Sequence, residues 1–168
     1  MEKENNSLMK IAQLTQQLEE HPEQYELRRE RAHLFLEMGL LKEAAADLDS
    51  LIQLTSVEAV ARAQMHLIEG NAQKAEETLR LSLGMYPDSK IEYISLSQIL
   101  SAQKKYPEAL DVLQKGIDRI QIFPEAYKER GRIRMLLHDS QGAMDDLKKA
   151  LEQDPNMLQD LNGKLTNL

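Results

Sequence analysis

Apolar residues recur every three or four positions along most of the chain, which places them on one side of an α-helix. One such stripe is formed by Leu8, Ile11, Leu14 and Leu18, and another includes Leu48, Leu51 and Ile52. Strict alternation of apolar and polar residues, the pattern of a half-buried strand, is almost absent. The pattern predicts an all-α protein with helices of about 12 to 16 residues.

Proline, glycine and hydroxyl residues mark where these helices are expected to begin and end. Proline suits the first helical turn because its missing N–H would have no partner there. The prolines at such positions are Pro22, Pro107, Pro124 and Pro155. Thr55 with Glu58, and Ser89 with Glu92, have the spacing of a capping box. Glycines at expected helix ends are Gly39 and Gly70.

The chain repeats itself. Ala75, Ala109 and Ala143 stand at the same place in successive segments, 34 residues apart, and Ala44 stands 31 residues before Ala75. We assign the three missing residues to the connector around Thr55, because Gly70 keeps its distance from Ala75. These four alanines, called the anchor alanines below, define one register.

Other positions follow the same register. Each predicted first helix carries a small residue, and these are Ala32, Ala63, Ser97 and Gly131. The fourth residue after each anchor alanine is leucine: Leu48, Leu79, Leu113 and Leu147. Pro87 and Pro155 lie 12 residues beyond their anchors. Pro22 has the same place relative to a partial copy, so residues 7–20 are interpreted as a second helix without its first.

A repeat of this length and pattern resembles the tetratricopeptide repeat. The copy at 124–157 matches best, with Tyr127, Gly131, Ala143, Leu147, Ala150 and Pro155 in place. The other copies depart from the pattern: Arg28 and Ala59 replace the aromatic residue, and the first and third copies lack the proline. The resemblance covers residues 7–157. It implies helix–turn–helix units stacked into a right-handed α-α superhelix that binds other proteins.

The expected organisation is a single domain, 1–168, of the tetratricopeptide-like solenoid class. Stacking is obligatory because one helical hairpin cannot bury its apolar face alone, and the ends need caps. The expected parts are a helix at 7–20, repeats at 23–55, 56–89, 90–123 and 124–157, and a capping helix at 158–168. The apolar stripe of that last helix consists of Leu158, Leu161, Leu165 and Leu168.

Paired changes between repeats predict salt bridges inside the first and fourth repeats. Arg31 precedes the small residue of repeat one and Asp47 precedes its leucine. Repeat four has Arg130 and Asp146 at the same places, whereas repeat three has the apolar pair Leu96 and Val112. We therefore expect Arg31–Asp47 and Arg130–Asp146 ion pairs between the two helices of each repeat. Repeat two breaks the pattern, since Arg62 is matched there with Thr78, next to Glu77.

Composition and charge narrow the function classes. The chain has 168 residues, 42% of them hydrophobic and 29% charged, with a formal net charge of −7. That charge argues against a nucleic-acid backbone as the partner. No window is long and apolar enough for a membrane span, and the first residues do not resemble a secretory signal. We expect a cytoplasmic protein with no nucleic-acid or membrane partner.

No catalytic, cofactor or metal motif is apparent, so the chain is not expected to be an enzyme or to bind a cofactor. The absence of cysteine excludes disulfides and thiolate zinc sites. The four histidines are scattered over different segments as His21, His33, His66 and His138. Neither a phosphate-binding glycine loop nor a GxSxG motif is present. We interpret these histidines as solvated or half-buried rather than as ligands.

The resemblance implies that the first helices line a concave groove that binds a partner. Carried over residue by residue, the predicted partner-binding residues are Arg29, His33, Val57, Val60, Gln64, Ile68, Ile91, Ile94, Gln98, Lys128, Arg132 and Met135. Equivalent places also hold Glu26, Glu37, Ser101 and Glu125. Members that grip the C-terminal carboxylate of chaperone tails use a lysine and an asparagine, for which this chain has Arg29 and His33. A chaperone tail is therefore not the expected ligand.

The middle of this set is apolar and the fourth repeat adds two cations. This arrangement predicts a protein or peptide partner with an apolar core and an acidic flank. The function expected is that of a non-catalytic adaptor or scaffold. Two other readings stay open: the apolar residues pack between repeats, or they join copies of the chain in a homo-oligomer. A regulatory accessory subunit of a larger complex is a further alternative.

Overall fold

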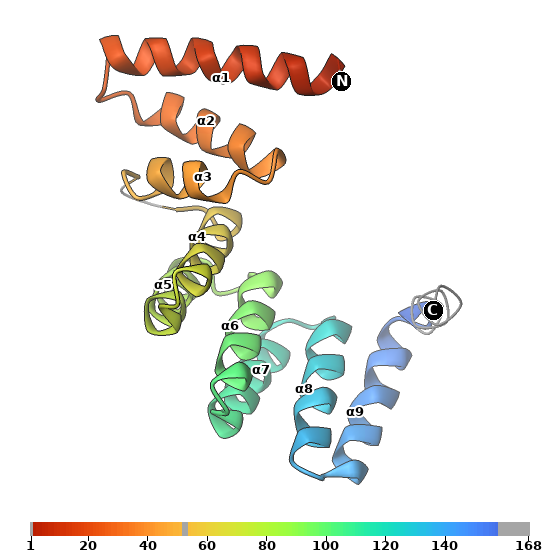
Figure 1. The fold of residues 1–168 in the computed structure, drawn as a ribbon. Coiled ribbons are helices and arrows are strands. Elements are labelled where there is room, and N and C mark those ends of the chain that lie inside the picture. The colour runs from red at the N-terminus through yellow and green to blue at the C-terminus, as the bar shows by residue number, and fades with distance from the viewer. Residues whose placement is uncertain (1, 52–53, 158–168) are drawn as a thin grey trace. The chain divides into compact units, whose positions relative to one another are not determined.

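The computed structural model describes residues 2–51 and 54–157, and in that part of the chain every regular element is an α-helix (Figure 1). The helices are α1 (Glu2–Glu20), α2 (Tyr25–Glu37), α3 (Leu41–Leu48), α4 (Ser56–Ile68), α5 (Ala72–Met85), α6 (Lys90–Ala102), α7 (Tyr106–Arg119), α8 (Pro124–Leu136) and α9 (Ser140–Gln153). The all-α prediction is confirmed. The capping helix expected at 158–168 lies outside the described residues.

The chain divides into two compact units, Met1–Thr78 (unit 1) and Leu79–Leu168 (unit 2), with the boundary inside α5. In unit 1, α1 packs on α2, α2 on α3 and α3 on α4. In unit 2, α6 packs on α7, α7 on α8 and α8 on α9, while α6 also contacts α8. Neighbours in sequence are therefore neighbours in space within each unit, as a stacked helical repeat requires.

The anchor alanines are buried, as the repeat pattern predicts. Ala44, Ala75 and Ala109 have 0% of their surface exposed, and Ala143 has 6%. Repeat four shows why the first helix carries a small residue opposite the anchor alanine. A Cβ on Gly131 would lie 3.2 Å from the carbonyl oxygen of Ala143, a separation tighter than ordinary contact. Small side chains thus let α8 and α9 approach closely.

The core of unit 2 contains an aromatic pair that another glycine accommodates. The rings of Tyr93 and Phe123 meet edge to face, with their centroids 6.3 Å apart. A Cβ on Gly116 would lie 3.0 Å from an atom of each ring, so only glycine leaves both rings undisturbed. In unit 1 the corresponding cluster is aliphatic and includes Ala32, Leu48, Leu51 and Ala61, with Leu36 and Leu54 packed against it.

One of the two predicted capping boxes forms. The backbone N–H of Thr55 donates to Glu58 Oε2 at 2.7 Å, and the backbone N–H of Glu58 donates to Thr55 Oγ1 at 3.4 Å. Ser89 makes no such side-chain bond, so the second prediction is wrong. Glu92 is buried and instead accepts a hydrogen bond from the Ser82 hydroxyl of α5.

The turn between the two helices of each repeat needs a residue with positive φ. Gly39 and Gly70 have φ of 72° and 76°, which confirms them as helix-ending residues. Lys104 and His138 occupy the same register places in repeats three and four, and both have φ of 61°. Side-chain-bearing residues are rarely found in this left-handed conformation, because their Cβ crowds the following carbonyl.

Both predicted intra-repeat ion pairs are present. Arg31 donates from Nε and Nη2 to the two carboxylate oxygens of Asp47 at 2.8 and 2.7 Å. Arg130 donates in the same fork geometry to Asp146 at 2.9 and 2.5 Å. Bonding to the carboxylate raises the pKa of Arg130 above its ordinary value, even though burial acts in the opposite direction.

The same arginines also reach the preceding second helix. Arg31 donates to Thr15 Oγ1 at 3.0 Å, and Arg130 donates to the side-chain oxygen of Gln114. Arg62 does not pair with repeat two's second helix but with Asp49, at 2.5 and 3.0 Å. In register, Asp49 and Gln114 are equivalent positions, five residues after their anchors. These arginines therefore link consecutive repeats, which the sequence did not reveal.

Candidate functional site

In unit 1 the predicted residues Arg29 and His33 of α2 meet at a carboxylate of α4. Glu58 has none of its surface exposed, and its Oε1 lies 2.9 Å from His33 Nε2. Its Oε2 lies 3.4 Å from Arg29 Nη1. An arginine and a histidine therefore converge on one buried acid, and they tie α2 to α4. The sequence indicated Glu58 as a capping residue, but gave no sign of these partners.

The electrostatics of this cluster favour a charged carboxylate. Burial raises the pKa of Glu58, but the backbone hydrogen bond from Thr55 and the hydrogen bonds from His33 and the Thr55 hydroxyl act against it. The positive charge of Arg29 adds to them, and the net result is a pKa below the ordinary value. The cluster is thus a structural joint between repeats one and two that leaves part of the His33 ring exposed.

The predicted α4 residues differ in how much surface they offer. Val57 and Ile68 are 59% and 62% exposed, and Gln64 is exposed as well. Val60 is 6% exposed, so its side chain packs inside the protein and has almost no surface left for a partner. The reading in which the apolar residues pack between helices therefore describes Val60, but not Val57 or Ile68.

In unit 2 the predicted residues come from α6 and α8, which lie against each other. Ile91 is 48% exposed, Ile94 is half-buried and Gln98 is exposed on α6. On α8, Lys128 and Arg132 are exposed and Met135 is 56% exposed. We call these six residues the α6–α8 surface. It combines apolar and cationic side chains on two adjacent helices of one unit.

Arg132 is held in place from both helices. Its Nη2 donates to Ser101 Oγ of α6 at 3.2 Å, and the Glu129 carboxylate accepts from its Nε and Nη2. The bonds to Glu129 raise the pKa of Arg132, although burial acts against them. Arg132 is therefore largely neutralised by its own helix. Lys128 has no carboxylate partner among residues 2–51 and 54–157 and carries the open positive charge of this surface.

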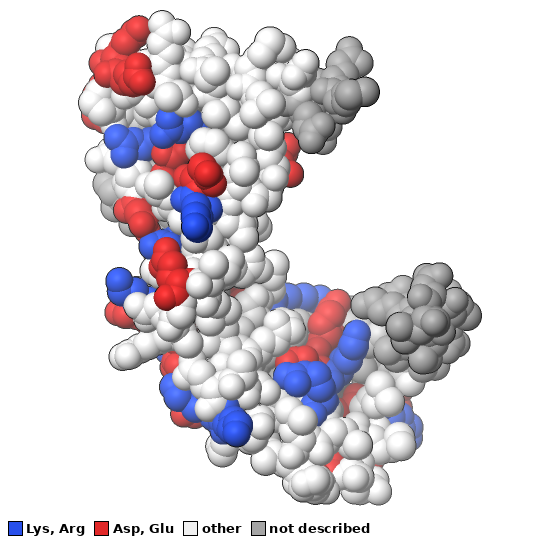
Figure 2. Space-filling model, viewed as in Figure 1, with Lys and Arg blue, Asp and Glu red and all other residues white. Residues whose placement is uncertain are grey.

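On the face shown in Figure 2, acidic and basic side chains gather in small mixed clusters, with uncharged surface between them. Within the described ranges, no group of three or more His, Asp or Glu residues is arranged to hold a metal ion. In the same ranges, no helix is long and apolar enough to cross a membrane.

The sequence matches no family model and no curated protein. Solved structures are similar. A crystal structure of MamA covers 89% of this chain and 89% of its own, with a TM-score of 0.77 at 18% identity. YrrB, a TPR protein with an unusual peptide-binding site, covers 95% of this chain and 84% of its own, with a TM-score of 0.78 at 13% identity. TTC0263, a thermophilic TPR protein in Thermus thermophilus, covers 94% of this chain and 87% of its own, with a TM-score of 0.61 at 19% identity. The chain thus has the tetratricopeptide-repeat fold, and the predicted all-α solenoid class is confirmed.

Proposed function

We propose that the protein is a non-catalytic interaction module and that its α6–α8 surface binds a peptide segment of another protein. One observation carries the proposal: exposed Ile91 and Met135 lie on adjacent helices together with Lys128, which has no carboxylate partner in the described part of the chain. An apolar segment with an acidic neighbour complements that combination. The similar fold of YrrB, described as having a peptide-binding site, supports it. The cytoplasmic location expected from the sequence stays part of this proposal.

The energetics favour a modest affinity. Full burial of one such side chain contributes about 1.5–3 kcal/mol, and both are already partly covered, so each has about half of that to gain. Ordering a peptide and losing its translational freedom subtract from this sum. The charge of Lys128 then contributes mainly to orientation and to the rate of association. We expect selectivity for an acidic flank rather than very tight binding.

Selection of short peptides from a display library against the full chain tests the proposal. The selected peptides are expected to combine aliphatic and acidic residues, and Ile91→Glu or Met135→Glu should weaken their binding. The matched control is Met144→Glu on α9, because Met144 is 64% exposed and lies outside this surface. Equal binding by all three variants would refute the proposal.

Self-association is the second candidate function, and one observation favours it. Leu8 and Met9 of α1 are 49% and 65% exposed, which leaves apolar surface on the first helix of unit 1. A homo-oligomer would cover these side chains. Light scattering over a range of concentrations tests it: a monomer at every concentration excludes this candidate, whereas a dimer that Met9→Glu dissociates supports it.

A further inference from the structure

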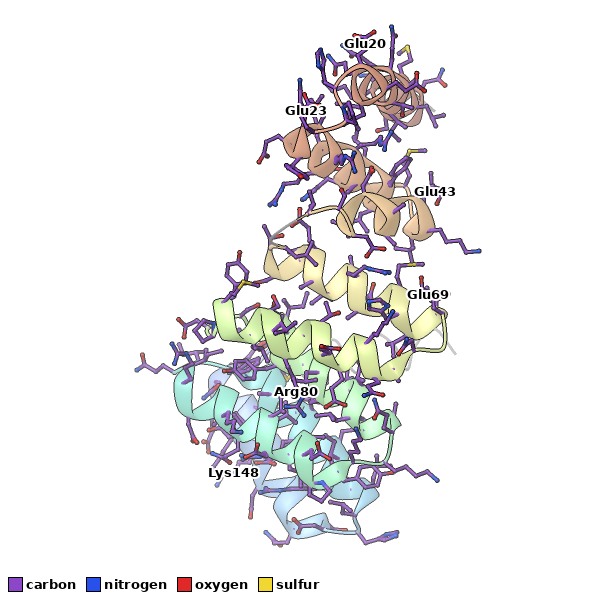
Figure 3. The ribbon with its side chains drawn as sticks, turned by 90° about the vertical axis from the view of Figure 1, so that its left-hand side faces the viewer. Glu20, Glu23, Glu43, Glu69, Arg80 and Lys148 are labelled. Atoms are coloured by element: carbon purple, nitrogen blue, oxygen red, sulfur yellow. The ribbon has the colours of Figure 1, made fainter. Side chains whose placement is uncertain are left out.

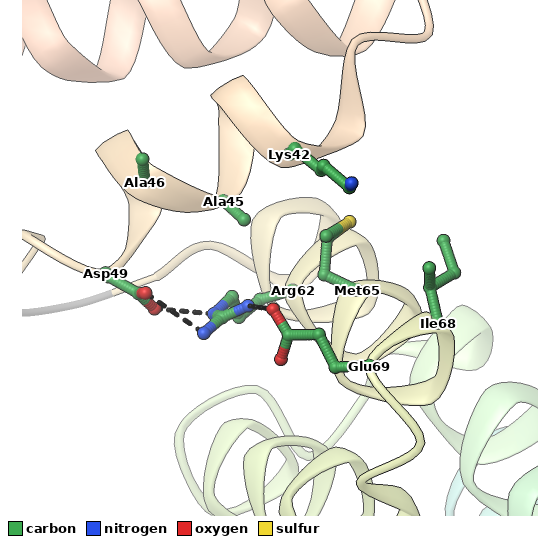
Figure 4. A pocket seen from close by; sticks show the side chains of 8 residues that line it. All are labelled: Lys42, Ala45, Ala46, Asp49, Arg62, Met65, Ile68 and Glu69. Atoms are coloured by element: carbon green, nitrogen blue, oxygen red, sulfur yellow. Dashed lines mark hydrogen bonds and ion pairs between the residues drawn. The ribbon is translucent and has the colours of Figure 1, made fainter.

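A pocket of about 520 Å³ lies within unit 1, between α3 and α4 (Figure 4). The residues that line it are Lys42, Ala45, Ala46 and Asp49 on the α3 side and Arg62, Met65, Ile68 and Glu69 on the α4 side. Glu43 near the start of α3 and Glu69 at the end of α4 lie at the same end of the unit (Figure 3). The two helices therefore run antiparallel along the pocket.

The pocket exists because repeat one is short and carries small side chains here. α3 has 8 residues, whereas α5, α7 and α9 have 14 each. In register, Ala45 stands where α7 has the half-buried Leu110. Repeat one therefore has a smaller side chain at this position than repeat three. The space has the size class of ligand pockets in proteins.

One end of the pocket is closed by a chain of charges. Arg62 bonds to Asp49, and its Nη1 lies 3.7 Å from Glu69 Oε1. Glu69 also accepts from the buried His66 ring at 3.2 Å. Both carboxylates are thus engaged by cations of the protein itself. Nη1 of Arg62 is buried and has no hydrogen-bond acceptor among the described residues, so the guanidinium still has a donor to offer.

The other end carries an open positive charge. Lys42 is exposed, extends from α3 over Met65 (Figure 4), and forms no ion pair in the part of the chain that the structure describes. Between the two ends the lining is apolar and consists of Ala45, Ala46, Met65 and Ile68. The available chemistry is therefore an aliphatic slot with a cation at its rim.

We propose that this pocket is a second binding site, for a peptide segment of a protein partner that carries a leucine-like side chain beside an acidic residue. The aliphatic side chain occupies the space over Met65, between Ala45 and Ile68, and the carboxylate pairs with Lys42. A main-chain carbonyl of the peptide is the acceptor that Arg62 Nη1 lacks. Charge complementarity selects this occupant over a basic segment, because Asp49 and Glu69 are already paired.

Binding of labelled peptide pools to the full chain tests the proposal by fluorescence anisotropy. The pools have either leucine or alanine at the centre and either acidic or basic residues around it. The acidic leucine pool is expected to bind about tenfold or more tightly than the others. Ala46→Phe places a large side chain at the edge of the pocket and should reduce that binding by a similar factor. Its control is Ala102→Phe, an exposed alanine at the end of α6.

Charge reversal provides a test that does not depend on filling the pocket. Lys42→Glu should invert the preference, so that the basic leucine pool binds best. Lys74→Glu is the matched control, since Lys74 is an exposed lysine in the first turn of α5. Circular dichroism confirms that each variant folds. If Ala46→Phe fails to fold, the inversion by Lys42→Glu decides alone.

The remaining outcomes separate this site from the α6–α8 surface and from self-association. The α6–α8 surface is expected to bind aliphatic and acidic peptides as well, so the pools are measured against the double variant Ile91→Glu, Met135→Glu, in which that surface is disabled. If this double variant no longer binds the acidic leucine pool, the peptide binds only the α6–α8 surface and the pocket proposal fails. No preference for leucine, or no inversion by Lys42→Glu, also overturns it. A dimer that Ala46→Phe dissociates, without peptide binding, would assign the pocket to a second copy of the chain instead.

Discussion

The ion pair between Arg130 and Asp146 supplies the sharpest stability prediction. Their side chains are 7% and 1% exposed, and Asp146 also pairs with Arg134 at 2.9 Å. Removing one partner of a buried pair leaves a charge without compensation and costs about 3–5 kcal/mol. Gln114 still accepts from Arg130, so we expect Asp146→Ala to cost about 3 kcal/mol, at the lower end of that range.

Replacing both partners at once is expected to cost much less. The protein contains its own apolar version of the pair, since Leu96 and Val112 hold these places in repeat three and are 1% and 5% exposed. Exchange of a buried pair for hydrophobic residues of similar volume is often neutral or stabilising. Arg130→Leu combined with Asp146→Val should therefore stay within about 1 kcal/mol of the unaltered protein.

Urea unfolding followed by circular dichroism measures the difference. The free energy of unfolding falls by about 1–3 kcal/mol per molar urea, so the unfolding midpoint of the double variant should lie about 1 M above that of Asp146→Ala. Asp145→Ala is the control: Asp145 is the exposed neighbour on the same helix and should change stability by less than about 0.5 kcal/mol. A double variant no more stable than Asp146→Ala would refute the reasoning. The loss of stability in Asp146→Ala could then not be explained by the unpaired charge that this change leaves buried.

Three further changes test other features. The folded-state pKa of Glu58 lies below its ordinary value of 4.5, so its contribution to stability is complete above that value and is lost as the pH falls through the lower folded-state pKa. Glu58→Gln should therefore reduce the loss of unfolding free energy at acid pH, measured by urea titrations at several pH values. The same loss in the variant and in the unaltered protein would contradict this expectation. His138→Gly relieves a left-handed conformation and should raise the free energy of unfolding by about 0.5–1 kcal/mol, measured as a higher melting temperature. A lower melting temperature would show that the positive φ of His138 is not strained. Gly116→Ala forces its methyl group into Tyr93 and Phe123 and should lower the free energy of unfolding by about 1–3 kcal/mol. Gly84→Ala is the control and should be neutral or stabilising, because there is open space around Gly84. Equal effects of the two changes would exclude the steric argument.

Features repeated within one hairpin were predictable from the sequence. The buried anchor alanines, the glycines at helix ends and the two intra-repeat ion pairs follow from residue types that recur in register. The prediction for Ser89 failed because a capping box depends on the rotamer of Glu92, which here turns to Ser82. Local spacing alone does not decide between a backbone N–H and a neighbouring helix as the partner of a buried acid.

Contacts between repeats were the part that the sequence did not reveal. Asp49, which bonds to Arg62, and His33, which bonds to Glu58, belong to the preceding repeat. Which partners meet depends on how one hairpin rotates against the next. The pattern of a single repeat does not contain that rotation. The pocket was missed for the same reason, although the three-residue deficit before Thr55 was visible and corresponds to a second helix that ends at Leu48. The α6–α8 surface remains a prediction on which binding experiments must decide.

The arginines that reach back to the preceding helix have a consequence for how the protein melts. They occur in repeats one, two and four, but repeat three has Leu96 at that place, and α5 contains the boundary between the two compact units. In a linear array, cooperativity is transmitted from neighbour to neighbour, so a weaker coupling divides the array into separate folding blocks. Scanning calorimetry should then give a van't Hoff enthalpy smaller than the measured heat, the signature of a transition with more than one step.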